Sequence, residues 1–165
     1  MNKEEKIALI RKSIKENRYP LEYDYKDGYR KGNCYSYVMG SKYEDIITFG
    51  EEYIYNLGCI SNQSPATNIE EAERNFVKDM EVLGIKVRKS CLDEITLEGE
   101  WKILLFYDDC FVDSYDFHFA RQDKGGQWSH REWIDGPVRI LGENPENCTD
   151  LTFVSYYVLK IDEQK

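Results

Sequence analysis

One cysteine and two histidines are the residues whose types and positions could perform chemistry together. Cys34 follows Gly32-Asn33, and the run after it ends at Gly40. Asn is a favourable N-cap and Gly a favourable helix end, so this pattern predicts a short helix that starts at the cysteine. The free amides of a first helical turn lower the pKa of a thiol and can stabilise an oxyanion. Cys34 is therefore a candidate nucleophile, with a buried structural cysteine as the alternative.

The two histidines of the chain, His118 and His130, lie on either side of the Gly125-Gly126 turn. A cysteine nucleophile needs a neighbouring base, and the base needs a third group that fixes its tautomer. A hairpin loop of three or five residues places the two histidines on the same face, whereas a two-residue turn places them on opposite faces. Asp116 is a rival orienting group, and Trp128 is either a cleft wall or a core residue. The alternative is two unrelated polar strand residues.

Metal binding is a second possible use of these side chains. Cys110, His118, His130 and Cys148 could ligate an ion, but their separations match no compact zinc-binding pattern. The five cysteines are an odd count without a CxxC pair, which predicts free thiols in a reducing compartment. The sequence has no Gly-rich phosphate loop, no Walker motif and no Gly-x-Ser-x-Gly elbow. We therefore expect neither a metal nor a cofactor.

The composition is typical of one globular domain, which we expect to span residues 1–165. The net charge of −9 argues against a phosphate-binding surface, so nucleic acid is not an expected partner. We find no signal-peptide core and no apolar stretch of transmembrane length, which predicts a cytoplasmic protein that does not bind membranes. A peptide or protein substrate or partner is compatible with the acidic charge, and the oligomeric state stays open.

The elements that would position these residues follow from periodicity. Helices are predicted over residues 3–17 and from Thr67 or Asn68 to Gly84. Residues 19–32 favour a loop or hairpin, and residues 43–57 either a helix broken at Gly50 or a loop and a strand. Aromatic and β-branched residues predict strands over 85–89, 101–107, 114–122, 127–131 and 151–159. Helices followed by an antiparallel sheet indicate an α+β fold, with the N-terminal helices packed on the sheet.

Two sequence blocks resemble a known group of proteins. Gly32-Asn33-Cys34-Tyr35-Ser36-Tyr37 resembles the Asn-Cys-Tyr start of the catalytic helix in little-characterised bacterial and phage proteins related to papain-like cysteine hydrolases. Asp116-Phe117-His118-Phe119-Ala120-Arg121-Gln122-Asp123, followed by Trp128-Ser129-His130, is similar to that group's second signature. The last predicted strand also fits, so the resemblance covers residues 30–160.

The resemblance implies a single domain with a papain-like fold, shared with bacterial cell-wall amidases, some of which use His as the third catalytic residue. It implies Cys34 as nucleophile, His118 as base and His130 as orienting group. The chain departs from the group in two respects. The Lys-Pro-Gly-like turn that usually follows Trp-Ser-His is replaced by residues 131–137, and no Gln upstream of Cys34 matches papain's oxyanion donor. Asn33 or Tyr29 would have to help in that role.

The function that this pattern favours is a thiol hydrolase, a peptidase or amidase. Cys34 would attack an amide or ester carbonyl, His118 would take and return the proton, and water would resolve the acyl-enzyme. The reaction could also be deamidation or acyl transfer. A function of another class is a binding or inhibitor protein on a papain-like scaffold, such as a phage-encoded antagonist of a host system, because a fold does not fix a function.

Overall fold

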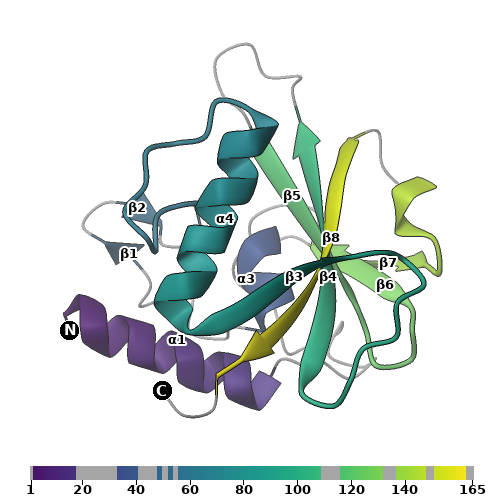
Figure 1. Ribbon diagram of the computed structural model, residues 1–165, viewed down its shortest axis with the longest axis horizontal. Coiled ribbons are helices and arrows are strands. Elements are labelled where there is room, and N and C mark those ends of the chain that lie inside the picture. The colour runs from purple at the N-terminus through teal and green to yellow at the C-terminus, as the bar shows by residue number, and fades with distance from the viewer. Residues whose placement is uncertain are drawn as a thin grey trace.

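An open antiparallel sheet of six strands dominates the computed structural model (Figure 1), which describes residues 2–17, 33–40, 48–49, 52–53, 56–108, 116–131, 137–147 and 151–162. The strand order is β3-β8-β4-β5-β6-β7. The strands are β3 Ile85–Ser90, β4 Glu100–Asp108, β5 Asp116–Gln122, β6 Trp128–Arg131, β7 Val138–Gly142 and β8 Thr152–Ile161. The helices are α1 Lys3–Asn17, α3 Cys34–Met39 and α4 Ile69–Leu83, and η2 Pro145–Asn147 is a short 3-10 turn.

The predicted α+β class is confirmed, and the two long helices form where their patterns predict them. Helix α4 begins after Asn68, whose side-chain oxygen accepts a hydrogen bond from the Glu71 amide at 2.8 Å. It ends at Gly84, which has the left-handed φ of 68° that glycine adopts without strain. Its buried face carries the apolar residues at helical spacing, among them Phe76 and Met80, which are fully buried.

Strand β7 is the element that sequence analysis misses. Its residues, Val-Arg-Ile-Leu-Gly, do not alternate between apolar and polar side chains. Ile140 is 52% exposed on this outer strand of the described sheet, beside β6. In the ambiguous region 43–57, the described strands β1 Thr48–Phe49 and β2 Glu52–Tyr53 pair with each other. The predicted loop or hairpin over residues 19–32 lies outside the described residues.

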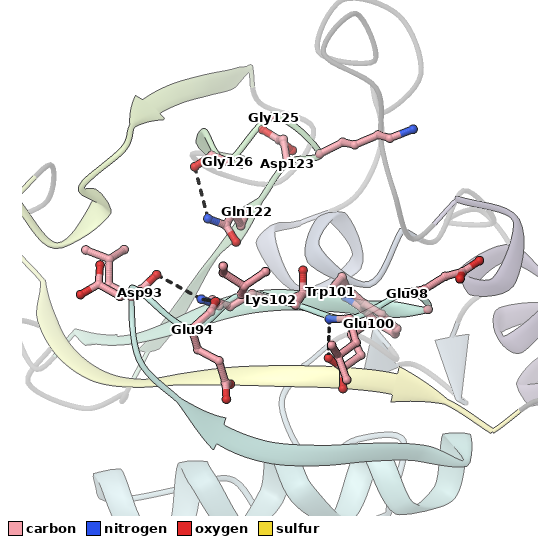
Figure 2. Close-up of a pocket in the computed structure, with 16 residues that line it drawn as sticks. Asp93, Glu94, Glu98, Glu100, Trp101, Lys102, Gln122, Asp123, Gly125 and Gly126 are labelled. Carbon is pink, nitrogen blue, oxygen red and sulfur yellow. Dashed lines mark hydrogen bonds between the residues drawn. The ribbon is translucent and has the colours of Figure 1, made fainter.

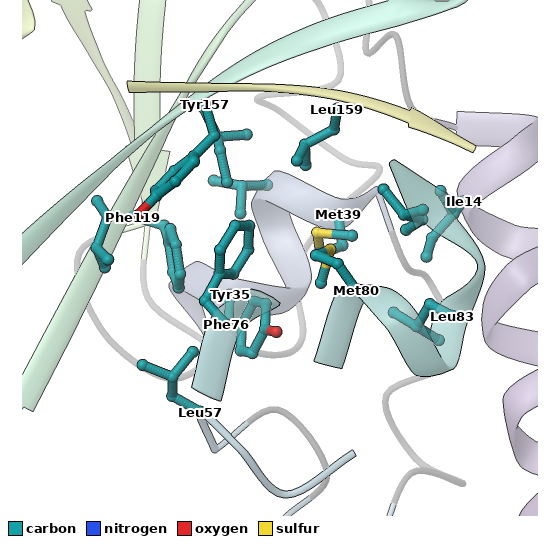
Figure 3. Close-up of a cluster of buried hydrophobic side chains, with 14 of the residues drawn as sticks. Ile14, Tyr35, Met39, Leu57, Phe76, Met80, Leu83, Phe119, Tyr157 and Leu159 are labelled. Atoms are coloured by element: carbon teal, nitrogen blue, oxygen red, sulfur yellow. The ribbon is translucent and has the colours of Figure 1, made fainter. Parts of the chain in front are cut away.

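Two hydrophobic clusters, one on each face of the sheet, form the core. The larger one joins α1, α3 and α4 to the sheet, and we call this side the helix face (Figure 3). The smaller one consists of buried side chains on the opposite face, which we call the open face because no described helix of the larger cluster covers it: Leu104, Phe106, Ala120, Trp128 and Tyr156. Side chains of one strand alternate between the two faces, so β4, β5 and β8 each supply buried residues to both clusters.

Helix α3 is buried along its whole length between α4 and the sheet. Two of the carbonyl groups near its C-terminus accept hydrogen bonds from strand side chains. Trp101 Nε1 donates to the Val38 carbonyl at 3.1 Å, and Arg121 Nη1 donates to the Tyr37 carbonyl at 2.9 Å. Because orphan carbonyls at a buried helix end need partners, these two strand residues fix where α3 lies on the sheet.

Candidate active site

Cys34 is the first residue of α3, as the sequence predicts. Asn33 and Ser36 form a reciprocal cap at this end: the Ser36 amide donates to Asn33 Oδ1 at 3.0 Å, and the Asn33 amide donates to Ser36 Oγ at 3.1 Å. The side-chain oxygen of Asn33 is therefore committed to the helix cap. Cys34 itself is buried, with 8% of its surface exposed.

The two histidines meet across the β5–β6 hairpin. His118 Nε2 lies 2.6 Å from His130 Nδ1, and the rings are perpendicular with centroids 4.9 Å apart. Strand pairing sets Arg121 opposite Ser129, and the Asp123 amide donates to the Gln127 carbonyl at 2.7 Å. This register corresponds to the odd-length loop, which places the histidines on one face. They are diagonal neighbours rather than directly opposite residues.

The faces of the sheet decide which other side chains the histidines can meet. Phe117 and Phe119 flank His118 in the chain, and both contact the Tyr35 ring of α3, with centroids 5.9 Å and 4.9 Å away. Because side chains alternate along a strand, His118 projects toward the open face. There its ring stacks on Phe106, at a centroid distance of 6.2 Å.

The same reasoning applies to His130. Ser129 Oγ lies 2.7 Å from the Tyr37 hydroxyl, and the Arg131 guanidinium lies 5.8 Å from the Tyr37 ring centroid. Residues on both sides of His130 thus contact α3 on the helix face, and alternation directs His130 to the open face. Both histidines are 9% exposed.

The structure therefore brings the two histidines together, while Cys34 belongs to the cluster of the helix face. Helix α3 runs alongside β5 in the same direction: Tyr35 contacts Phe117, and two residues later the Tyr37 carbonyl contacts Arg121. This places Cys34 toward the N-terminal end of β5, the end that carries His118. The pairing of Cys34 with His118 stays a prediction.

The remaining sequence candidates fall into two groups. Trp128 is fully buried and packs against Tyr156 on the open face, with ring centroids 5.5 Å apart, so it is a core residue. Asp116 is the first residue of β5, and its side chain is outside the described part of the structure. Tyr29, Cys110 and Cys148 also lie outside the described residues.

Two buried arginines on the helix face escape sequence reasoning. The Arg121 guanidinium lies 3.6 Å above the Tyr37 ring centroid, and its Nε donates to Asp123 Oδ1 at 3.1 Å. Arg121 and Arg131 are each 1% exposed. Arginine in a strand is usually an exposed residue, so the sequence carries no signal for this arrangement. It holds α3 against the hairpin that carries both histidines.

A hollow of about 660 Å³ lies away from this site, between the loop from β3 to β4 and the Asp123–Gly126 turn (Figure 2). Cys34 and the two histidines do not line it. Lys102 of β4 holds this loop, because its Nζ donates to the carbonyls of Cys91, Leu92 and Glu94. Burial lowers the pKa of the Lys102 ammonium. Two of the residues that line this hollow, Ile95 and Leu97, are 85% and 70% exposed.

Further observations concern metal, membrane and relatives. Among the described residues, no group of three or more His, Cys, Asp or Glu side chains is arranged to hold a metal ion. In the same part of the chain no helix is both long and apolar enough to cross a bilayer. Comparisons with family models, with curated proteins and with solved structures give no match for this chain.

Proposed function

We propose that the protein is a thiol hydrolase, a peptidase or amidase with a papain-like fold, in which Cys34 is the nucleophile, His118 the base and His130 the orienting group. The observation that carries this proposal is the distance of 2.6 Å between His118 Nε2 and His130 Nδ1. A base that is hydrogen-bonded through one ring nitrogen is fixed in tautomer and orientation, which is what a third catalytic residue provides.

The proposed mechanism requires one of the two possible assignments of the shared proton. When His118 Nε2 carries the proton and donates to His130 Nδ1, the lone pair of the base is at His118 Nδ1. That nitrogen would take the Cys34 proton as the sulfur attacks a carbonyl, and would return it to the leaving amine or alcohol. Water would then attack the thioester, with His118 again as base, and release the acid.

The mechanism requires Cys34 to reach a histidine that projects to the other face of the sheet. The N-terminal position of Cys34 on α3 supports this, because α3 starts near the N-terminal end of β5 and His118 is the third residue of that strand. Around the end of a strand, side chains from both faces can meet without crossing the hydrogen-bonded ladder. The Sγ–Nδ1 contact is thus expected past this end of β5.

The test uses a p-nitrophenyl ester as an acyl donor and mass spectrometry as the readout. We expect a burst of nitrophenol and an acyl group attached to Cys34, both abolished in Cys34→Ala and strongly slowed in His118→Ala. Cys91 is exposed whereas Cys34 is buried, so selective acylation of Cys34 cannot result from access alone. Equal acylation of Cys91, or a burst that survives Cys34→Ala, would contradict the proposal.

A binding protein on the same scaffold is the second candidate, and the exposed pair Ile95 and Leu97 favours it. Large aliphatic side chains exposed on an anchored loop are typical of protein-binding surfaces. We expect an Ile95→Ser/Leu97→Ser variant to lose the biological effect under this alternative, while Cys34→Ala keeps it. Under the hydrolase proposal, Cys34→Ala should lose the biological effect and the Ile95→Ser/Leu97→Ser variant should keep it.

A further inference from the structure

One buried carboxylate accepts hydrogen bonds from two other parts of the chain. Asp79 of α4 is fully buried, and its Oδ2 accepts hydrogen bonds from the Tyr35 hydroxyl at 2.9 Å and from the Gly58 amide at 2.8 Å. Its Oδ1 accepts from the Ser61 amide at 3.0 Å and from Ser61 Oγ at 2.6 Å. A buried carboxylate needs such partners, and here they tie α3 and the turn at residues 57–62 to α4.

The turn that shares this carboxylate has little freedom to move. Gly58 has a φ of +90°, and a Cβ there would lie 2.8 Å from Asn75 Nδ2. Asn75, one helical turn before Asp79, donates to the Ser64 carbonyl at 2.9 Å. Two polar side chains of α4 therefore hold the turn from the same helix face. Asp79 is thus held in place, and it provides a fixed hydrogen-bond acceptor for the Tyr35 hydroxyl.

Tyr35 joins this anchor to the strand of the candidate base. Its hydroxyl donates to Asp79, and its ring meets Phe117 edge-on at 5.9 Å. The same ring stacks on Phe119 at 4.9 Å (Figure 3). Phe117 and Phe119 are the chain neighbours of His118, and Tyr35 is the chain neighbour of Cys34. A single side chain therefore relates the first turn of α3 to β5 around His118.

We propose that Tyr35, held by Asp79, is a positioning residue that sets the placement of Cys34 relative to His118. The inference rests on the proposed thiol chemistry. Loss of the hydroxyl bond frees the Tyr35 ring to slide on Phe117 and Phe119, and the backbone of Cys34 moves with it. A small displacement of the Cys34 backbone separates the nucleophile from its base without unfolding the protein.

Two variants separate positioning from stability. Tyr35→Phe keeps the ring and removes only its hydroxyl bond to Asp79, whereas Ser61→Ala removes one hydroxyl bond to the other oxygen of the same carboxylate. We expect similar losses in unfolding free energy from both. Alkylation of Cys34 by iodoacetamide at pH 6 is expected to slow about tenfold in Tyr35→Phe, as for a thiol pKa raised by about one pH unit, and to stay unchanged in Ser61→Ala.

A crosslink adds a readout that also depends on the distance between the two thiols. In His118→Cys, dibromobimane should bridge Cys34 and the introduced thiol, and the additional change Tyr35→Phe should lower the yield. If Cys34 of the unsubstituted protein is alkylated no faster than Cys91, the proposed function fails. The crosslink yield alone then decides the positioning role. The inference would be overturned if Tyr35→Phe changed neither the alkylation rate of Cys34 nor the crosslink yield.

Discussion

His118 and His130 share one hydrogen bond, with Nε2 and Nδ1 2.6 Å apart, and each ring has a different second environment. The His118 ring stacks on Phe106, whereas His130 lies in β6, paired in the ladder with Arg139 of the edge strand β7. A hydrogen bond between two imidazoles needs one proton between the nitrogens, so each ring determines the tautomer of the other. The pair therefore acts as one unit.

Replacing the orienting member should weaken acylation without abolishing it. We expect His130→Ala to slow acylation of Cys34 by a p-nitrophenyl ester about 10- to 100-fold, because His118 loses the partner that fixes its tautomer. His130→Asn should recover part of the rate, since an amide can reach the position of Nδ1. Arg139→Ala, which changes the exposed ladder partner of His130, is the control and should keep the full rate. An unchanged rate in His130→Ala would assign the pair a structural role.

The buried ion pair beneath α3 should dominate the stability of the hairpin. Arg121 and Asp123 are each 1% exposed at the side chain, and Nε and Oδ1 lie 3.1 Å apart. We expect Arg121→Met to cost about 3–5 kcal/mol in urea unfolding, because it leaves a buried carboxylate without its charge partner. The double variant with Asp123→Asn should be less destabilised than the sum of the single changes. Additive costs would show that the two side chains do not stabilise each other.

Two glycines with similar backbone angles should respond differently to alanine. Gly58 and Gly126 have φ of +90° and +89°, but a Cβ at Gly58 meets Asn75 whereas a Cβ at Gly126 meets nothing within 4 Å. Gly126→Ala should cost about 1 kcal/mol from backbone strain alone, and Gly58→Ala about 2–4 kcal/mol in chemical unfolding. Equal costs would mean that the Asn75 side chain moves aside freely.

The Glu100 carboxylate should make stability dependent on pH. Hydrogen bonds from the Arg88 guanidinium and the Leu97 amide hold the pKa of Glu100 below its ordinary value. Its contribution is therefore complete above the ordinary glutamate pKa and is lost as the pH falls through the lowered value. We expect Glu100→Gln to lower Tm by a few degrees at pH 7, and the difference to shrink below about pH 4. Glu98→Gln, at an exposed position, is the control, and a difference that is constant with pH would contradict the assignment.

Local patterns were sufficient for much of the fold. The helix from Asn68 to Gly84 and the short helix at Cys34 carry both caps and apolar spacing in their own sequence, and both form as predicted. The five predicted strands also form, with ends shifted by a few residues. Strand β7 was not predicted, because its five residues, Val-Arg-Ile-Leu-Gly, do not alternate between apolar and polar side chains.

The candidate site was less predictable, for a physical reason. The loop between the histidines could have an odd or an even length, and only the register shows that they share a face. Which face α3 covers depends on contacts between residues distant in sequence, such as Tyr35 with Phe119. The roles of Asp79 and Arg121 depend on the same long-range packing, so their sequence neighbours carry no sign of them.

The two outer strands of the described sheet differ in how they would meet a second copy of the chain. Strand β3 exposes Lys86, Arg88 and Lys89, and like charges facing each other resist edge-to-edge pairing. Strand β7 exposes Ile140 and a single cation, Arg139, along its edge. Aggregation at high concentration is therefore expected to begin at β7, and a lysine in place of Ile140 should raise the solubility limit without touching the core.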